Sequence, residues 1–141
     1  MDIIETDVLV VGGGIVGLAL LKEVSKDKNC ILIEKNHSLI EETSSRNSGV
    51  IHSGIYYPED SYKSKFCIEG KKLLYKFCEK YDISHKKTGK LLIGNKDNLQ
   101  KFFSLIENAS DMEIEHELLS KQQIASTLPF LEGQEFLNIK D

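Results

Sequence analysis

Three glycines near the start of the chain have a spacing that suits the binding of a diphosphate. Gly12, Gly14 and Gly17 form the pattern G-x-G-x-x-G directly after the apolar run of residues 7–11. In such a pattern the first glycine permits a tight turn, the second lets a pyrophosphate approach the backbone, and the third lets a helix lie close to a strand. Ile15 and Val16 would open that helix, whose N-terminal N–H groups and partial positive charge favour an anion.

An acidic residue stands where the second half of a dinucleotide-binding unit needs one. Glu34 lies twenty residues after Gly14, at the end of the apolar run Cys30–Ile33, and Lys35 follows it. A carboxylate at this position can accept hydrogen bonds from both hydroxyls of an adenosine ribose, and it disfavours NADP because it repels a 2′-phosphate. FAD and NAD both carry adenosine diphosphate, so the glycines and Glu34 leave both open. A glycine-rich turn without a ligand is the alternative.

A second cluster of polar side chains follows, and its members are hydrogen-bond donors. Arg46 is the only arginine of the chain, and its guanidinium could bind a phosphate through two parallel hydrogen bonds, which a lysine cannot reproduce. The alternative is a solvated loop of turn residues with Arg46 as a surface cation. The cluster consists of Thr43, Ser44, Ser45, Arg46, Asn47 and Ser48.

The elements that must position these residues form a β-α-β unit. Residues 7–11 and 30–33 have the β-branched and leucine-rich composition of strands buried on both faces, and a helix with Leu18, Leu21 and Val24 is expected between them. Residues 36–54 are expected to be an extended loop. Beyond it, we expect helices over 61–81 and 98–108 and strands over 89–93 and 112–118. Ser120 and Gln123 predict a capping box for a short helix that ends before Pro129.

Composition limits the classes of protein to consider. The 141 residues are 40% hydrophobic and 28% charged, with a formal net charge of −4, which gives no reason to expect a nucleic-acid partner. No apolar run approaches the length of a transmembrane helix, so no transmembrane segment is predicted. Cys30, Cys67 and Cys78 are expected to be free thiols. The histidines lack ligand spacing, so no metal site is predicted.

The run from Thr43 to Tyr57 resembles the second flavin motif of the FAD-dependent D-amino-acid-oxidase-like (DAO) superfamily, and within it most resembles the L-2-hydroxyglutarate dehydrogenase/oxidase family. The resemblance covers residues 6–95. Its further matches are Pro58, Lys63, Lys65, Cys67, Gly70, Leu73, Leu74, Tyr75, Cys78 and Gly89–Leu91. This chain has Ser44-Ser45-Arg46 where clear L-2-hydroxyglutarate enzymes tend to have Thr-Gly-His, which leaves the exact substrate open.

The resemblance implies an α/β fold: a Rossmann-like FAD/NAD(P)-binding domain with a parallel sheet and helices, followed by the start of an α+β substrate domain. We expect residues 1–85 to belong to the FAD-binding domain and residues 86–141 to begin the substrate domain, with the chain an N-terminal fragment. FAD would bind along the glycines, Glu34, Lys35 and the cluster 43–48. His52 would lie close to the isoalloxazine ring, although from its neighbours it could equally be a partly buried structural histidine.

The implied activity is oxidation of a small 2-hydroxy acid, L-2-hydroxyglutarate, to 2-oxoglutarate by hydride transfer to flavin. The alternatives are another flavoenzyme of this superfamily, acting on an amino acid, an amine or glycerol phosphate, and a truncated nucleotide-binding remnant without catalysis. The electron acceptor is open between oxygen and a quinone, and no catalytic base is assigned. We expect a cytoplasmic protein that could associate with the inner membrane.

Overall fold

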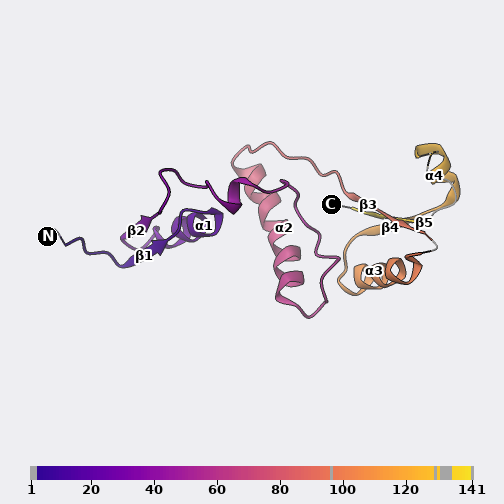
Figure 1. The fold of residues 1–141 in the computed structure, drawn as a ribbon, viewed down its shortest axis with the longest axis horizontal. Coiled ribbons are helices and arrows are strands. Elements are labelled where there is room, and N and C mark those ends of the chain that lie inside the picture. Colours follow the sequence, from indigo (N-terminus) through magenta and orange to yellow (C-terminus); the bar gives the residue numbers. More distant parts are fainter. Residues whose placement is uncertain (1–2, 96, 129, 131–134, 141) are drawn as a thin grey trace. The chain divides into compact units, whose positions relative to one another are not determined.

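The computed structural model describes residues 3–95, 97–128, 130 and 135–140. The chain divides into two compact units, Met1–Val50 and Ile51–Asp141, which we describe separately. Figure 1 shows the elements in chain order. They are β1 (Val8–Val11), α1 (Ile15–Val24), β2 (Cys30–Ile33), η1 (Thr43–Ser45), α2 (Tyr62–Lys80), β3 (Lys90–Gly94), α3 (Leu99–Asp111), β4 (His116–Leu119), α4 (Lys121–Thr127) and β5 (Glu135–Ile139).

The first unit is the predicted β-α-β unit. β1 and β2 pair in parallel, with Val8 opposite Cys30 and Val11 opposite Ile33. Parallel neighbours need a crossover connection, and α1 supplies it and lies against both strands (Figure 1). The loop after β2 is extended as expected, except that it contains the short 3-10 helix η1.

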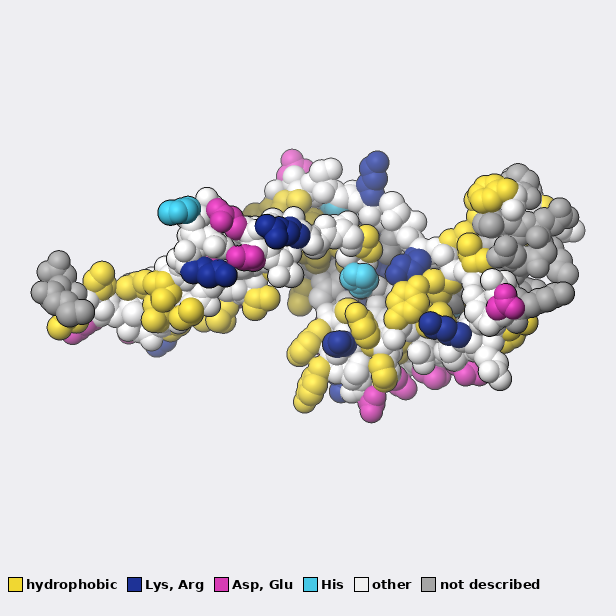
Figure 2. Space-filling model, in the orientation of Figure 1, with side chains coloured by type: hydrophobic (Ala, Val, Ile, Leu, Met, Phe, Trp, Pro, Cys, Tyr) yellow, Lys and Arg dark blue, Asp and Glu magenta, His cyan; other side chains and the backbone are white. Residues whose placement is uncertain are grey.

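The prediction that both strands of this unit are buried on both faces is wrong. Val10 is buried, but Leu9 is 53% exposed and Val11 is 76% exposed. The reason is that, in the described part of this unit, only α1 covers the two-stranded sheet. The face of the sheet opposite α1 therefore has no covering layer. Figure 2 shows the hydrophobic side chains that remain on the surface of this unit.

The second unit combines helices with an antiparallel sheet. α2 begins after Ser61, whose hydroxyl accepts a hydrogen bond from the N–H of Ser64 (3.1 Å) and so caps the helix. This agrees with the helix predicted over residues 61–81, with Ser61 as its N-cap and Lys80 as its last helical residue. In the sheet, β5 lies between β3 and β4 and pairs antiparallel with both.

The core of the second unit lies where α3 and its following turn meet the sheet. Phe102 and Ala109 on α3 are buried together with Leu92 on β3 and Ile139 on β5. Ile55, from the segment before α2, is fully buried in the same cluster. This cluster anchors the segment that carries Ser53 and the pocket described below.

Several element boundaries differ from the predictions. β5 was not predicted. α3 extends to Asp111, and Glu113 adopts a positive φ of 52° that ends it, so the strand predicted from Met112 begins only at His116. The capping box of Ser120 and Gln123 is confirmed. Pro129, predicted to end α4, lies outside the described residues.

Candidate functional site

The turn between β1 and α1 has the backbone geometry that a diphosphate-binding turn requires. Gly12 has a φ of +104°, a conformation that side chains other than glycine rarely adopt. Its N–H donates a hydrogen bond to the carbonyl oxygen of Ile33 (2.8 Å), which extends the pairing of β1 with β2 by one residue. The chain therefore leaves the sheet in a sharp turn immediately after the last paired residue.

Gly17 allows the helix to approach this turn closely. A Cβ added at Gly17 would overlap the carbonyl oxygen of Gly12 and would also contact a methyl group of Val10 at 3.4 Å. The neighbouring atom is backbone, so it cannot move away as a flexible side chain could. This confirms in physical terms why the third position of the motif needs glycine.

The N-terminus of α1 has N–H groups available for an anion. Gly14 is the N-cap and contributes no side chain, while the N–H of Ile15 donates to the hydroxyl oxygen of Ser44 (3.0 Å). The N–H groups of Val16 and Gly17 have no acceptor in the part of the chain that the structure describes. Such N–H groups, together with the helix dipole, bind phosphate in many proteins. The side chains of Ile15 and Val16 are exposed beside them.

Glu34 follows β2 and is held against the glycine turn. Its carboxylate accepts a hydrogen bond from the N–H of Asn36 (2.9 Å) and another from the N–H of Gly13 (2.6 Å). These two donors, first Asn36 and then Gly13, lower the pKa of the Glu34 carboxyl below its ordinary value. Glu34 is therefore an anion at neutral pH, and its two oxygens retain lone pairs that can accept ribose hydroxyls.

A second carboxylate ties the end of β2 to the polar loop. Lys35 forms an ion pair with Glu42 (3.2 Å), and the side-chain amide of Asn36 donates to the same carboxylate oxygen (3.3 Å). Lys35 and then Asn36 lower the pKa of Glu42 by stabilising its charged form. Glu42 is the N-cap residue of η1. These contacts position the predicted cluster 43–48 relative to Glu34.

Within that cluster the side chains divide into those used by the loop and those left available. The hydroxyl of Ser45 donates to the carbonyl oxygen of Glu41 (2.8 Å), and Asn47 bonds to Ser44 and Gly49 of its own loop. The guanidinium of Arg46 is exposed and makes no ion pair or hydrogen bond with any described residue. Thr43 and Ser48 are also exposed.

His52 belongs to the second unit, and its side chain is exposed. The interpretation of His52 as a partly buried structural histidine is therefore wrong. The buried residues of this segment are its neighbours Ser53 and Gly54. Its predicted proximity to the isoalloxazine ring stays a prediction.

Sequence reasoning overlooked three residues of this site. Gly13 donates to Glu34, and a Cβ there would overlap the side chain of Leu39; the third consecutive glycine was a visible signal of this. Asn36 and Glu42 were also overlooked, and no local pattern marks them, since their partners come from different segments.

The glycine turn, the available N–H groups of α1 and the carboxylate of Glu34 together form a cradle that offers donors to a diphosphate and acceptors to a ribose. The residues present therefore fit an adenosine diphosphate group.

None of the helices described is long and apolar enough to cross a membrane.

Curated relatives of this chain are L-2-hydroxyglutarate dehydrogenases. The Arabidopsis thaliana enzyme is 48% identical over 90 residues, which cover 63% of this chain and 19% of that protein. The Dictyostelium discoideum enzyme is 38% identical over 133 residues, and the human enzyme 34% over 132 residues; each match covers 90% of this chain, and they cover 30% and 28% of those proteins. The chain thus spans less than a third of these relatives.

These relatives also correct one prediction. All three are named as mitochondrial proteins, so the prediction of a cytoplasmic protein that could associate with the inner membrane is wrong.

Solved structures agree on the fold. L-α-glycerophosphate oxidase from Mycoplasma pneumoniae, with FAD bound, matches with a TM-score of 0.76 and 30% identity over 98% of this chain and 38% of that one. L-proline dehydrogenase from P. horikoshii matches with a TM-score of 0.74 over 96% of this chain and 38% of that one, at 21% identity. These neighbours confirm the predicted α/β, Rossmann-like fold.

The model of the DAO family, described as FAD dependent oxidoreductase, matches residues 7–138. That match covers both the glycine turn and the polar loop, and it confirms FAD over NAD as the predicted cofactor. The chain belongs to the DAO family of FAD-dependent oxidoreductases.

Proposed function

We propose that this chain is part of a flavoenzyme that oxidises L-2-hydroxyglutarate to 2-oxoglutarate. The substrate is inferred from the names of the curated relatives, which reach 48% identity. The reaction class follows from membership of the family. The structural observation that carries the proposal is the cradle formed by the glycine turn and the N–H groups of Val16 and Gly17, which have no acceptor among the described residues.

In this proposal the first unit holds the adenosine diphosphate half of FAD. The turn at Gly12 and the N-terminus of α1 face the pyrophosphate, and Glu34 accepts the ribose hydroxyls. The polar loop adds donors that the helix end cannot supply, chiefly the exposed guanidinium of Arg46. The proposed cofactor-binding residues are Gly12, Gly14, Ile15, Val16, Gly17, Glu34, Lys35, Thr43, Ser44, Ser45, Arg46, Asn47, Ser48 and His52.

When bound, FAD supplies the two-electron acceptor that oxidation of a 2-hydroxy acid requires. The role of the residues described here is to bind and orient that cofactor, and we assign none of them to proton transfer. We further propose that residues 1–85 belong to the FAD-binding domain and residues 86–141 begin the substrate domain.

Glycerol phosphate is the second candidate substrate. The observation that favours it is the likeness to L-α-glycerophosphate oxidase, which extends over 98% of this chain at 30% identity. The higher identity to L-2-hydroxyglutarate dehydrogenases places the hydroxy acid first.

Cofactor binding is tested first. Purified protein is expected to show a flavin absorbance spectrum with FAD in stoichiometric amount. Arg46→Lys should weaken FAD binding by about tenfold, since a lysine cannot form the paired hydrogen bonds of a guanidinium. Lys28→Arg is the matched control, because Lys28 is an exposed cation of the same unit outside the proposed site. Absence of bound flavin would instead favour the non-catalytic remnant.

Turnover is tested separately on the complete, flavin-loaded enzyme of which this chain is proposed to be a part. L-2-hydroxyglutarate, its D-enantiomer, glycerol 3-phosphate and an L-amino acid are compared, with oxygen consumption and reduction of a soluble quinone as two readouts. Selective oxidation of L-2-hydroxyglutarate supports the proposal. Selective oxidation of glycerol 3-phosphate would instead make glycerol phosphate, the second candidate, the substrate. Flavin-loaded protein that oxidises none of the four would contradict the substrate assignment while leaving the cofactor assignment intact.

A further inference from the structure

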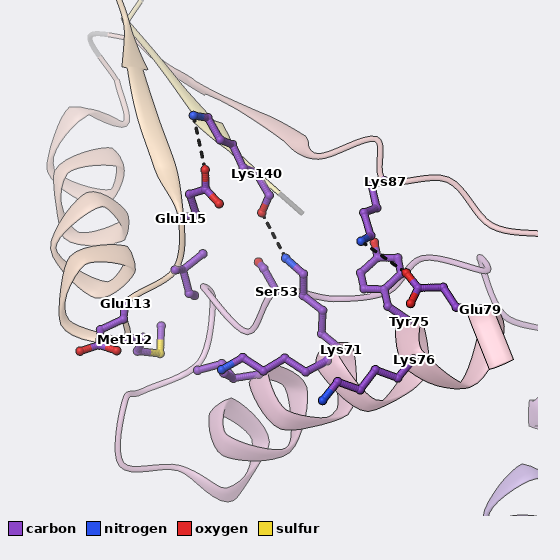
Figure 3. Close-up of a pocket in the computed structure, with 13 residues that line it drawn as sticks. Ser53, Lys71, Tyr75, Lys76, Glu79, Lys87, Met112, Glu113, Glu115 and Lys140 are labelled. Atoms are coloured by element: carbon purple, nitrogen blue, oxygen red, sulfur yellow. Dashed lines mark hydrogen bonds and ion pairs between the residues drawn. The ribbon is translucent and has the colours of Figure 1, made fainter.

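The second unit contains a pocket of about 530 Å³, and none of the residues that line it is among those proposed to bind FAD. It lies between α2 and the segment that connects α3 to β4, with Lys140 after β5 on its far side (Figure 3). Its apolar lining comes from Ile68 and Tyr75 on α2 and from Met112 and Ile114. The volume falls within the range of small-molecule sites, which combine an apolar lining with a few polar groups.

A buried hydroxyl without a partner lines this pocket. Ser53 is 8% exposed, and its Oγ makes no hydrogen bond in the described structure. Buried hydroxyl groups nearly always have a partner, because leaving one unsatisfied is unfavourable. In Figure 3 the Oγ of Ser53 points to the same side of α2 as the ammonium group of Lys71. A ligand in the pocket is the group that could bond to this hydroxyl.

The charged groups around the pocket leave an excess of positive charge. Two of its lysines are already paired: Lys87 lies 3.8 Å from Glu79, and Lys140 lies 3.5 Å from Glu115. Lys71 donates a hydrogen bond to the carbonyl oxygen of Lys140 (3.1 Å).

Three further charged side chains line the pocket without such pairing. The ammonium groups of Lys72 and Lys76 and the carboxylate of Glu113 form no ion pair with any residue that the structure describes. Lys72 and Lys76 are four residues apart on α2 and so lie on one face of the helix. Even with Glu113 included, the lysines outnumber the carboxylates at the pocket.

We propose that this pocket binds a small organic anion. Its carboxylate or phosphate group would be held by Lys72 and Lys76 together with the hydroxyl of Ser53, and its carbon chain would lie against Ile68, Tyr75 and Met112. A charge-assisted hydrogen bond from a lysine is stronger than one from a neutral donor, and it serves carboxylates and phosphates alike. The site goes beyond the proposed function, because none of its residues is among those proposed to bind FAD.

The binding experiment uses calorimetry at constant ionic strength with two anionic probes, glutarate for the carboxylate chemistry and glycerol 2-phosphate for the phosphate chemistry. Pentane-1,5-diol and glycerol serve as the neutral counterparts. We expect saturable binding of at least one anion and of neither neutral compound. Binding of glutarate alone identifies a carboxylate site, and binding of glycerol 2-phosphate alone identifies a phosphate site. Failure of both anions to saturate would overturn the proposal.

Substitutions locate the binding in this pocket. The double variant Lys72→Gln/Lys76→Gln should weaken anion binding by about tenfold or more. The matched control is Lys65→Gln/Lys80→Gln, which removes the same charge from the same helix at positions outside the pocket. Equal loss in both double variants would show non-specific attraction by α2 and would overturn the proposal.

Ser53→Ala provides an independent test that does not alter charge. It should weaken anion binding by about threefold, while the thermal unfolding midpoint without ligand stays the same or rises, because an unsatisfied buried hydroxyl is removed. Circular dichroism spectra check that each variant is folded. Unchanged anion affinity in Ser53→Ala would show that this hydroxyl does not face the ligand.

Discussion

The hydroxyl oxygen of Ser44 accepts a hydrogen bond from the backbone N–H of Ile15, at 3.0 Å, although the two residues are 29 positions apart. Gly14, the N-cap residue of α1, has no side chain to perform this function. The polar loop therefore caps the helix that the glycine turn begins. Stability of the helix N-terminus and position of the loop are linked through this single bond.

Ser44→Ala tests this link. Loss of the acceptor should lower the free energy of unfolding by about 1 kcal/mol, the usual cost of removing an N-terminal capping group. Urea unfolding followed by circular dichroism measures it. Ser48→Ala is the control, since Ser48 is exposed in the same loop, and its effect should stay within about 0.5 kcal/mol. Equal stability of Ser44→Ala and wild type would contradict the capping role.

Gly17→Ala should disrupt the packing of α1 on the glycine turn. The added Cβ would overlap the carbonyl oxygen of Gly12, and overpacking of this kind costs about 1–3 kcal/mol. FAD affinity should fall as well, because the turn must shift. Gly70→Ala is the matched control, because a Cβ at Gly70 meets nothing within 4 Å. Gly70 lies in the middle of α2, where alanine is a better helix former, so this variant should raise the free energy of unfolding by about 0.5–1 kcal/mol. Thermal unfolding and flavin retention are the measurements.

The carboxylate of Glu34 should make stability depend on pH in the acid range. The N–H groups of Asn36 and Gly13 lower its pKa in the folded state, below the ordinary value of 4.5. The unfolded state therefore takes up a proton first as the pH falls, so the contribution of Glu34 is complete above pH 4.5 and is lost below it.

Thermal unfolding of wild type and Glu34→Gln between pH 7 and pH 3.5 measures this contribution. The gap between the two midpoints should be constant near neutral pH and should narrow as the pH falls through the acid range. Glu41→Gln, an exposed carboxylate without a hydrogen bond among the described residues, should show no such change in gap. A gap for Glu34→Gln that stays constant at every pH would rule out this account.

Gly94→Ala should destabilise the core of the second unit. A Cβ at Gly94 would lie 2.7 Å from the ring of Phe102, which is 3% exposed, and relief requires movement of a buried ring. The expected cost is about 1–3 kcal/mol. A double-mutant cycle with Phe102→Leu tests the mechanism. The smaller leucine should relieve part of the clash, so the double variant should lose less free energy of unfolding than the sum of the two single variants. Strict additivity would show that the clash is not with this ring.

The β-α-β unit could be predicted because its signals are local. Short apolar runs, the glycine spacing and an acid after the second strand all lie within residues 7–34, and the strands were found with β2 at its observed bounds. Exposure of Leu9 and Val11 could not be predicted in the same way, since burial depends on what covers a strand and not on the strand's own composition.

β5 was missed because its partners are distant in the sequence. It is the central strand of the sheet, and its Ile139 lies opposite both Lys90 and His116. Local periodicity in the sequence cannot predict such distant pairings. β4 was placed too early because Met112 and Ile114 are apolar and read as strand, whereas they belong to the turn that ends α3, where the N–H of Ile114 donates to the carbonyl of Ala109.

The site shows the same division between local and distant contacts. The motif glycines and Glu34 were identified from their spacing, while the contacts of Asn36 and Glu42 depend on how the loop folds back toward β2.

The central position of β5 has a consequence for the order in which the second unit can assemble. β3 and β4 are both synthesised before β5, yet neither is hydrogen-bonded to the other, and each finds its partner only in β5. During translation the strand edges of β3 and β4 that pair with β5 must stay bound to water until β5 leaves the ribosome. The sheet therefore closes in a late, cooperative step, and helices α2 and α3, whose internal backbone hydrogen bonds are local, can form ahead of it.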